Sequence, residues 1–282
     1  MGKNSSIGWT DHTFNPWIGC TKVSPGCENC YAEELMTKHW RQVEWGPTAT
    51  RKLTAWSTWA GPTRWQREAA RDSVTPRRRV FCASLADVFE RKAIDLRNAD
   101  LDQWRNELWL VIEATPNLDW LLLTKRPENI VEMVPDEWRN AGAWPHNVWI
   151  GTSVENQKYA EQRIDHLLAV HSPNNFLSIE PMLGPVSLLP WIERLQWIIC
   201  GGESGPKARP MDVSWATSIR DECIAATVPF FFKQWGGRRH DSNGNLLEGA
   251  QWMQFPEYRP IPIKLRTAVP TSCSHTVPEG SV

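Results

Sequence analysis

Residues 15–34, NPWIGCTKVSPGCENCYAEE, are the stretch around which the rest of this sequence is organised. They hold three cysteines, Cys20, Cys27 and Cys30, in the spacing Cys-x6-Cys-x2-Cys. A Ser-Pro-Gly run between the first two cysteines favours turns, which let a short loop direct its thiols toward one point. Three such ligands in one loop predict a metal or cluster site.

The number of cysteines leaves three interpretations open. Three thiolates are one fewer than a structural zinc ion or an electron-transfer iron–sulfur cluster normally takes. A 4Fe–4S cluster would keep one iron free to bind a small molecule. A zinc ion would need a fourth ligand, for which His12 and His39 are candidates, and unligated buried thiols are the third interpretation.

The motif resembles that of the radical S-adenosylmethionine superfamily. In that superfamily three clustered cysteines near the start of the chain end in Cys-x2-Cys and an aromatic residue, here Tyr31. The common spacing there is Cys-x3-Cys-x2-Cys, so the longer first loop is a departure. With its surroundings, WTDHTFNPWIGCTKVSPGCENCYAE, the motif more closely resembles a phage-associated branch known by its three-Cys motif. The resemblance implies a 4Fe–4S cluster on Cys20, Cys27 and Cys30, with S-adenosylmethionine on the open iron.

The composition is that of a soluble globular protein. The formal net charge of −1 gives no global electrostatic argument for nucleic acid, although 18 tryptophans are an unusually large number. The first residues contain no apolar segment, and no run of 18 apolar residues follows. We therefore expect a cytoplasmic location, in the host cell if a phage encodes the protein, with no membrane partner and reduced thiols.

Short apolar runs recur along the chain and are separated in most cases by segments of helical pattern. The runs are RVFCAS, DWLLLT, VWIGTS, NFLSIE, QWIICGG and VPFFFKQW. With a first strand over residues 7–17 and a first helix over residues 31–40, this rhythm predicts parallel βαβ units. The predicted fold is α/β, a full or partial (β/α) barrel of six to seven parallel strands, and a doubly wound sheet is the alternative. We expect a single domain over residues 1–258 and a poorly ordered tail over residues 259–282.

Polar residues follow the end of each predicted strand. The carboxyl ends of parallel strands share one edge of a barrel, so these residues are expected to converge beside the cysteine loop. This convergence favours an enzyme over a metal-stabilised binding module. The predicted cofactor-binding residues are Ser84, Asp87, Thr124, Ser153, Glu155, Glu180 and Glu203. The predicted substrate-binding cations at the same edge are Lys125, Arg126 and Lys233, which would also balance the carboxylates.

Residues 41–79 show no sustained period and are predicted to form an irregular basic insertion. They hold nine Lys or Arg against three Asp or Glu, interleaved with tryptophans. Basic residues among aromatic rings are typical of nucleic-acid binding, whereas a solvated basic loop is the alternative. The predicted substrate contacts in this segment are Trp56, Trp59, Arg77, Arg78 and Arg79.

The sequence therefore leaves two candidate functions. The resemblance implies an enzyme that takes an electron from a donor, cleaves S-adenosylmethionine and abstracts hydrogen from its substrate. We expect that substrate to be a nucleobase, a nucleotide or DNA, for example a hypermodified base in phage DNA. The alternative is a non-catalytic, zinc-stabilised nucleic-acid-binding protein with three cysteines and one histidine on the metal.

Overall fold

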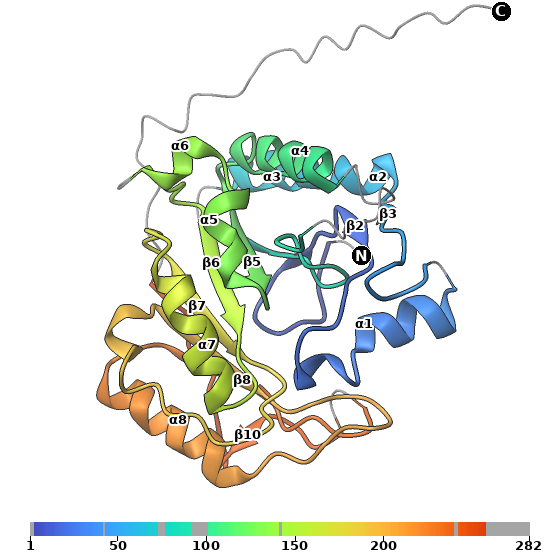
Figure 1. The fold of residues 1–282 in the computed structure, drawn as a ribbon. Helices are drawn as coiled ribbons and strands as arrows, with labels where there is room; N and C mark the ends of the chain where they lie inside the picture. Colours follow the sequence, from blue (N-terminus) through green and yellow to red (C-terminus); the bar gives the residue numbers. More distant parts are fainter. Residues whose placement is uncertain are drawn as a thin grey trace, which may run out of the picture.

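The computed structural model of the chain describes residues 3–41, 43–72, 77–91, 101–140, 143–239 and 242–257. The predicted tail over residues 259–282, with Cys273, lies outside these residues. The fold is α/β, with a seven-stranded parallel sheet that curves into a partial (β/α) barrel (Figure 1). The predicted fold class is confirmed in its partial form.

The order of strands in the sheet follows the order of the chain, and each strand is parallel to the next. The strands are β1 (His12–Thr13), β4 (Arg78–Cys82), β5 (Leu118–Thr124), β6 (Val148–Ser153), β7 (Asn175–Ile179), β8 (Trp197–Gly201) and β9 (Phe230–Gln234). Because every connection crosses over to a parallel neighbour, all carboxyl ends lie at one edge of the sheet. We call this the carboxyl edge.

Helices cover the outer face of the sheet (Figure 1). They are α4 (Leu101–Glu113), α5 (Ile130–Met133), α6 (Asp136–Arg139), α7 (Gln157–Leu168) and α8 (Val213–Ala225), with the 3-10 turns η4 (Pro127–Asn129) and η5 (Ile192–Arg194). Leu108 of α4, Ile164 of α7 and Ile219 of α8 join outward strand residues such as Val80 and Ile150 in the main core. A short hairpin, β10 (Leu246–Leu247) and β11 (Ala250–Gln251), comes after the last strand.

The concave inner face of the sheet carries a second, aromatic core. Its buried members are Trp9, Phe81, Leu121, Phe176, Trp197, Ile199 and Phe231, and none of them belongs to a helix. Side chains alternate between the two faces of a strand, so residues two further along point the same way. This alternation places Ser178, Glu180 and Lys233 on the concave face beyond the aromatic core, at the carboxyl edge.

The predicted first strand over residues 7–17 is divided in two. Only β1 joins the main sheet, whereas β2 (Trp17–Ile18) pairs with β3 (Lys52–Leu53) in a separate antiparallel ladder. Asn15 marks the division, because its fully buried side chain accepts from the backbone N–H of Leu85 at 2.7 Å. The next residue, Pro16, has no N–H with which to extend the strand.

The insertion over residues 41–79 is more regular than predicted. It contains β3, α2 (Trp56–Trp59) and α3 (Gly61–Arg71), and α3 carries a proline in its first turn. Trp65 of α3 is buried and stacks on His12 with ring centroids 4.4 Å apart. The prediction of an irregular segment was wrong here because it considered the tryptophan spacing over the whole insertion rather than within one helix.

The helix predicted over residues 31–40 is present. It begins as α1 (Tyr31–Glu33) and continues as the π-helix η2 (Glu34–His39). Ala32 and Met36 bury one side of it against Ile18 and Leu85. Among the described residues, no helix is long and apolar enough to cross a membrane.

Candidate functional site

The cysteine loop, residues 19–30, lies at the carboxyl edge of the sheet. Its start is fixed by Gly19, whose N–H donates to the carbonyl of Leu85 at 3.0 Å just beyond β4. The 3-10 turn η1 (Pro25–Cys27) comes next, and Cys30 is the N-cap of α1. The loop therefore stands where the sequence predicted it, over the ends of the strands.

Glu155, which comes just after β6, holds the middle of the cysteine loop. Its side chain is fully buried and accepts from Ser24 Oγ at 2.6 Å and from Arg163 Nη1 at 3.0 Å. Gly26 packs directly against it, so that a Cβ on Gly26 would lie 2.5 Å from Glu155 Cγ. One carboxylate oxygen of Glu155 thus binds the cysteine loop, and the other binds Arg163 of α7.

Glu203, which comes just after β8, holds the end of the loop in the same manner. It accepts from Asn29 Nδ2 at 3.1 Å and from Arg209 Nη2 at 2.6 Å. Arg209 in turn donates to the carbonyl of Pro25 at 2.8 Å and to Glu28 at 2.9 Å. Burial would raise the pKa of Glu203, but the hydrogen bonds from Arg209 and Asn29 lower it below its usual value.

Cys20 borders a buried network of charges. Arg126 Nη1 lies 3.7 Å from Cys20 Sγ and 2.8 Å from Asp87 Oδ2. Asp87 also accepts from Thr124 Oγ1 at 2.7 Å, which ties the ends of β4 and β5 together. Burial, with a contribution from the Glu90 carboxylate, raises the pKa of the Cys20 thiol to about 12. In the metal-free protein this thiol is therefore protonated, and binding a metal there would release its proton.

Arg51, which comes from the insertion, completes this network. Its guanidinium donates two hydrogen bonds of 2.8 Å to Glu90, one to the carbonyl of Ala49 at 2.7 Å and one to Thr21 Oγ1 at 2.7 Å. Arg126 adds an ion pair of 3.5 Å to the same Glu90. A bidentate pair between two buried groups fixes geometry as well as charge, so part of the insertion supports the cysteine loop.

Cys30 packs against the small core of Ile18, Ala32, Met36 and Leu85. Burial raises the pKa of its thiol, and the charges of Cys27 and Lys125 are close enough to affect it in opposite directions. The Tyr31 side chain is about half exposed, and its hydroxyl donates to the carbonyl of Ser84 at 3.1 Å. Burial raises the pKa of that hydroxyl to about 12, with smaller effects from Cys30 and Glu180.

The predicted cofactor residues fall into two groups. Asp87, Thr124, Glu155 and Glu203 lie in the networks described above, while the Ser84 hydroxyl accepts from Asn15 Nδ2 at 3.0 Å. Ser153 is buried, and its carbonyl accepts from Arg163. Glu180 lies on the concave face and pairs with Lys233, one of the predicted substrate residues, at 2.8 Å.

The predicted contacts in the insertion are not brought to this site. Arg77 is buried and pairs with Asp119 and with the carbonyls of Pro116 and Leu118 at the amino end of β5. Arg79 pairs with Asp11, and Arg78 lies 4.0 Å from Asp72. All three arginines stand at or before the start of β4, whereas the cysteine loop lies beyond the ends of the strands.

The two predicted stacking tryptophans differ from each other. Trp56 is 77% exposed, whereas Trp59 is partly buried and meets Phe14 edge-on at 5.5 Å between ring centroids. Only Trp56 is therefore free to stack on a base.

Sequence reasoning missed the residues that hold the loop, chiefly Ser24, Glu90, Arg163 and Arg209. Arg163 lies inside a helical pattern and Arg209 inside an irregular segment, so neither has a local signal. Of these residues, only Ser24 lies in a segment with a local signal, the turn-forming Ser-Pro-Gly run between the first two cysteines.

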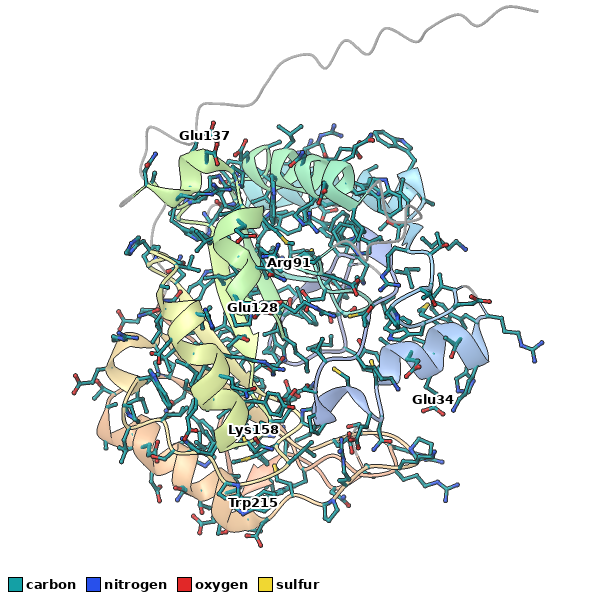
Figure 2. All side chains as sticks on the ribbon, viewed as in Figure 1. Glu34, Arg91, Glu128, Glu137, Lys158 and Trp215 are labelled. Atoms are coloured by element: carbon teal, nitrogen blue, oxygen red, sulfur yellow. The ribbon has the colours of Figure 1, made fainter. Side chains whose placement is uncertain are left out.

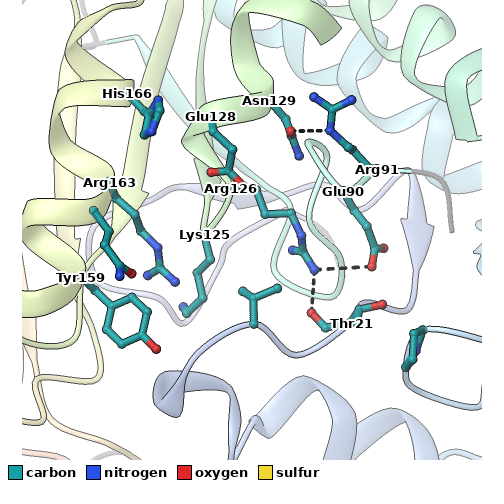
Figure 3. Close-up of a pocket in the computed structure, with 13 residues that line it drawn as sticks. Thr21, Glu90, Arg91, Lys125, Arg126, Glu128, Asn129, Tyr159, Arg163 and His166 are labelled. Atoms are coloured by element: carbon teal, nitrogen blue, oxygen red, sulfur yellow. Dashed lines mark hydrogen bonds and ion pairs between the residues drawn. The ribbon is translucent and has the colours of Figure 1, made fainter.

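A cavity of about 700 Å³ opens beside the loop. Tyr159, Arg163 and His166 extend from α7 on one side, Arg126 and Glu90 lie on the other, and Lys125 lies between them (Figure 3). Asn156 is the N-cap of α7, and its side chain accepts from the Tyr159 N–H. Thr21 and Val23 of the cysteine loop form part of the wall.

Three cysteines on one loop are the candidate ligands for a metal ion or a cluster. Cys20, Cys27 and Cys30 are free thiols, each partly exposed, on one loop. Within the described residues, no group of three or more His, Cys, Asp or Glu side chains is arranged to hold a single ion. A cluster places each thiolate on a different iron. His12, one proposed zinc ligand, stacks on Trp65 instead.

Comparison with known proteins identifies the family. A family described as a protein of unknown function (DUF5131) matches residues 4–256. The chain belongs to this family. No curated protein matches it.

Two solved structures, both mutants of spore photoproduct lyase, are similar to the chain. A Tyr-to-Phe mutant has a TM-score of 0.41 and 11% identity, covering 79% of this chain and 63% of that one. A Cys-to-Ala mutant has a TM-score of 0.41 and 13% identity, covering 72% of this chain and 58% of that one. The chain thus spans less than two thirds of the length of either.

Proposed function

We propose that this member of the family is a radical S-adenosylmethionine enzyme. The observation that carries the proposal is the placement of three partly exposed cysteines on one loop at the mouth of a partial barrel. Cys20, Cys27 and Cys30 would hold a 4Fe–4S cluster, leaving one iron for the cofactor. When bound, the cluster and S-adenosylmethionine supply one-electron cleavage of the sulfonium and hydrogen abstraction from an unactivated carbon.

The residues of the chain have separate tasks in this proposal. Glu155 and Glu203 orient the cysteine loop through Ser24 and Arg209. The concave aromatic core closes the barrel below the mouth and keeps water from that side. Glu180, paired with Lys233 and partly exposed, is the carboxylate proposed to meet the amino group of the cofactor.

The zinc alternative is less well supported by the surroundings of its histidines. The charged groups that affect His12 are Asp11, Arg78, Glu68 and Lys3, none of which belongs to the cysteine loop. His39 is exposed at the far end of η2. A tetrahedral site would require one of them beside the thiols.

Metal and sulfide analysis of anaerobically prepared protein tests the proposal. We expect a brown protein that contains iron and sulfide and forms 5′-deoxyadenosine when S-adenosylmethionine and a reductant are supplied. Cys27→Ala should lose the iron, whereas Cys223→Ala, which alters a buried thiol of α8, should retain it. A colourless protein with one zinc ion would support the alternative instead.

The substrate is proposed to be a nucleobase or a nucleotide, and an electron donor is required. The buried Arg77 and the packed Trp59 remove most of the support for a nucleic-acid groove on the insertion. The cavity beside α7 is the better candidate for substrate binding.

A further inference from the structure

The cavity beside the cysteine loop has the size of a site for a small organic molecule. Its volume of about 700 Å³ lies within the roughly 300–1,000 Å³ that is usual for ligand pockets. It lies between the loop and α7, and its lining includes neither Glu180 nor Lys233. A molecule in this cavity would lie next to the cysteine loop.

Several polar groups in this cavity keep donor hydrogens for which the part of the chain that the structure describes provides no acceptor. Arg163 is 5% exposed, and only its Nη1 has acceptors, so Nε and Nη2 keep unused hydrogens. Lys125 Nζ makes no hydrogen bond to a described residue, and its nearest carboxylate oxygen, on Glu155, is 4.0 Å away. The hydroxyl of Tyr159 is likewise unpaired among the described residues, while its ring lies under the Arg163 guanidinium at 4.5 Å. The hydrogen-bond donors of Lys125, Tyr159 and Arg163 thus lie on one wall of the cavity.

The charge on this wall is positive. Lys125 and Arg163 both approach the single carboxylate of Glu155, at 4.0 and 3.0 Å, so that carboxylate balances only one of the two cations. Arg126 and Arg51 on the opposite wall are balanced by Asp87 and Glu90. A partly buried ammonium beside a guanidinium with free N–H groups is an arrangement that binds phosphate or carboxylate.

The outer rim of the cavity offers groups of a different kind. Glu128, Gln162 and His166 line it and make no hydrogen bond to other described residues. Glu128 and Arg91 lie on the face of the molecule that carries α7 (Figure 2). Carboxylate, amide and imidazole groups can pair with the donors and acceptors of a base edge.

We propose that this cavity binds a nucleotide-sized substrate through its phosphate, with Lys125, Arg163 and Tyr159 as the donors. A phosphate fits these donors better than a carboxylate does, because it presents three acceptor oxygens to groups that approach from different side chains. The assignment of this ligand as the substrate rests on the proposed function. Its binding requires no cluster.

The test measures binding to the cluster-free protein at low salt by titration calorimetry. The ligands are thymidine 5′-monophosphate, thymidine and a short single-stranded oligonucleotide. We expect the monophosphate to bind at least tenfold more tightly than thymidine, which corresponds to about 1.4 kcal/mol. A stronger oligonucleotide signal that depends equally on Lys125 would identify the source of the phosphate as a polynucleotide.

Variants locate the site. Lys125→Met should weaken monophosphate binding at least tenfold and Tyr159→Phe several-fold, while both keep the wild-type melting temperature within a few degrees. Lys38→Met removes the same charge from η2 at an exposed position outside the cavity and should change binding less than twofold. If Lys125→Met does not fold, Tyr159→Phe and Lys125→Arg carry the test.

Four results would overturn the inference. They are no binding by the wild type, equal binding of thymidine and its monophosphate, unchanged binding in Lys125→Met, and competition by S-adenosylmethionine in the cluster-loaded protein. Failure of the proposed function is a separate result. A protein that binds the monophosphate but never holds iron would support the binding site proposed here and contradict the proposed radical chemistry.

Discussion

Replacing Gly26 by alanine tests whether Glu155 truly holds the cysteine loop. The added Cβ would lie 2.5 Å from both Cγ and Oε1 of Glu155, and Oε1 is the oxygen that accepts from Ser24. Glu155 is fully buried and also paired with Arg163, so it cannot move aside without leaving a partner. Gly26 has no positive φ, and the cost therefore comes from the contact and not from backbone strain.

The magnitude depends on the bonds that the methyl group displaces. A hydrogen bond to a charged group contributes about 1.5–3 kcal/mol, and losing the one from Ser24 should lower the free energy of unfolding by that amount. Loss of the Arg163 pair would add to it, because a buried charge left unpaired is costly. For a domain of this size about 2 kcal/mol lowers the melting temperature by several degrees.

Two measurements on the cluster-free protein distinguish global from local effects. Denaturant unfolding gives the free energy, and the rate of thiol modification relative to wild type reports detachment of the loop, since Cys82, Cys200 and Cys223 are buried. Gly8→Ala is the control, because its Cβ would make only an ordinary contact of 3.4 Å. Wild-type stability together with wild-type thiol reactivity in Gly26→Ala would refute the role of Glu155.

Three further predictions concern the cluster, the mouth and the buried histidine. Cys20→Ala should abolish iron binding, whereas Cys200→Ala should leave it intact, as iron analysis will establish; equal iron in the two would contradict the ligand assignment. Glu180→Gln should reduce 5′-deoxyadenosine formation per iron at unchanged iron content, and full activity would remove this residue from the cofactor site. Burial lowers the pKa of His12 below its usual 6.5, so its contribution to stability is complete above pH 6.5 and is lost as the pH falls toward the folded-state pKa. His12→Gln should therefore flatten the loss of stability between pH 7 and 5 in denaturant titrations, and an unchanged slope would show that other groups, such as His146, whose pKa burial also lowers, dominate.

The position of the cysteine loop at the carboxyl edge could be predicted from the sequence, because both signals involved are local. Apolar runs alternating with helical segments specify parallel strands, and parallel strands bring the residues after each strand to one edge of the sheet. The Cys-x6-Cys-x2-Cys spacing lies within one loop, so it can be seen without any contact between distant residues. Glu155 and Glu203 were found for the same reason, since each comes directly after a strand.

The roles of these carboxylates were decided by tertiary structure alone. Glu203 meets Asn29, 174 residues away in the sequence, and Glu155 meets Ser24, 131 residues away. A hydrogen bond between distant segments leaves no periodic or spacing signal in either of them. The same limit applies to Arg77, whose place in a basic run suggests a phosphate contact, although burial beside Asp119 makes it part of the framework. The sequence thus determined which groups gather at the carboxyl edge, and only packing decided which of them hold the loop and which stay free for a ligand.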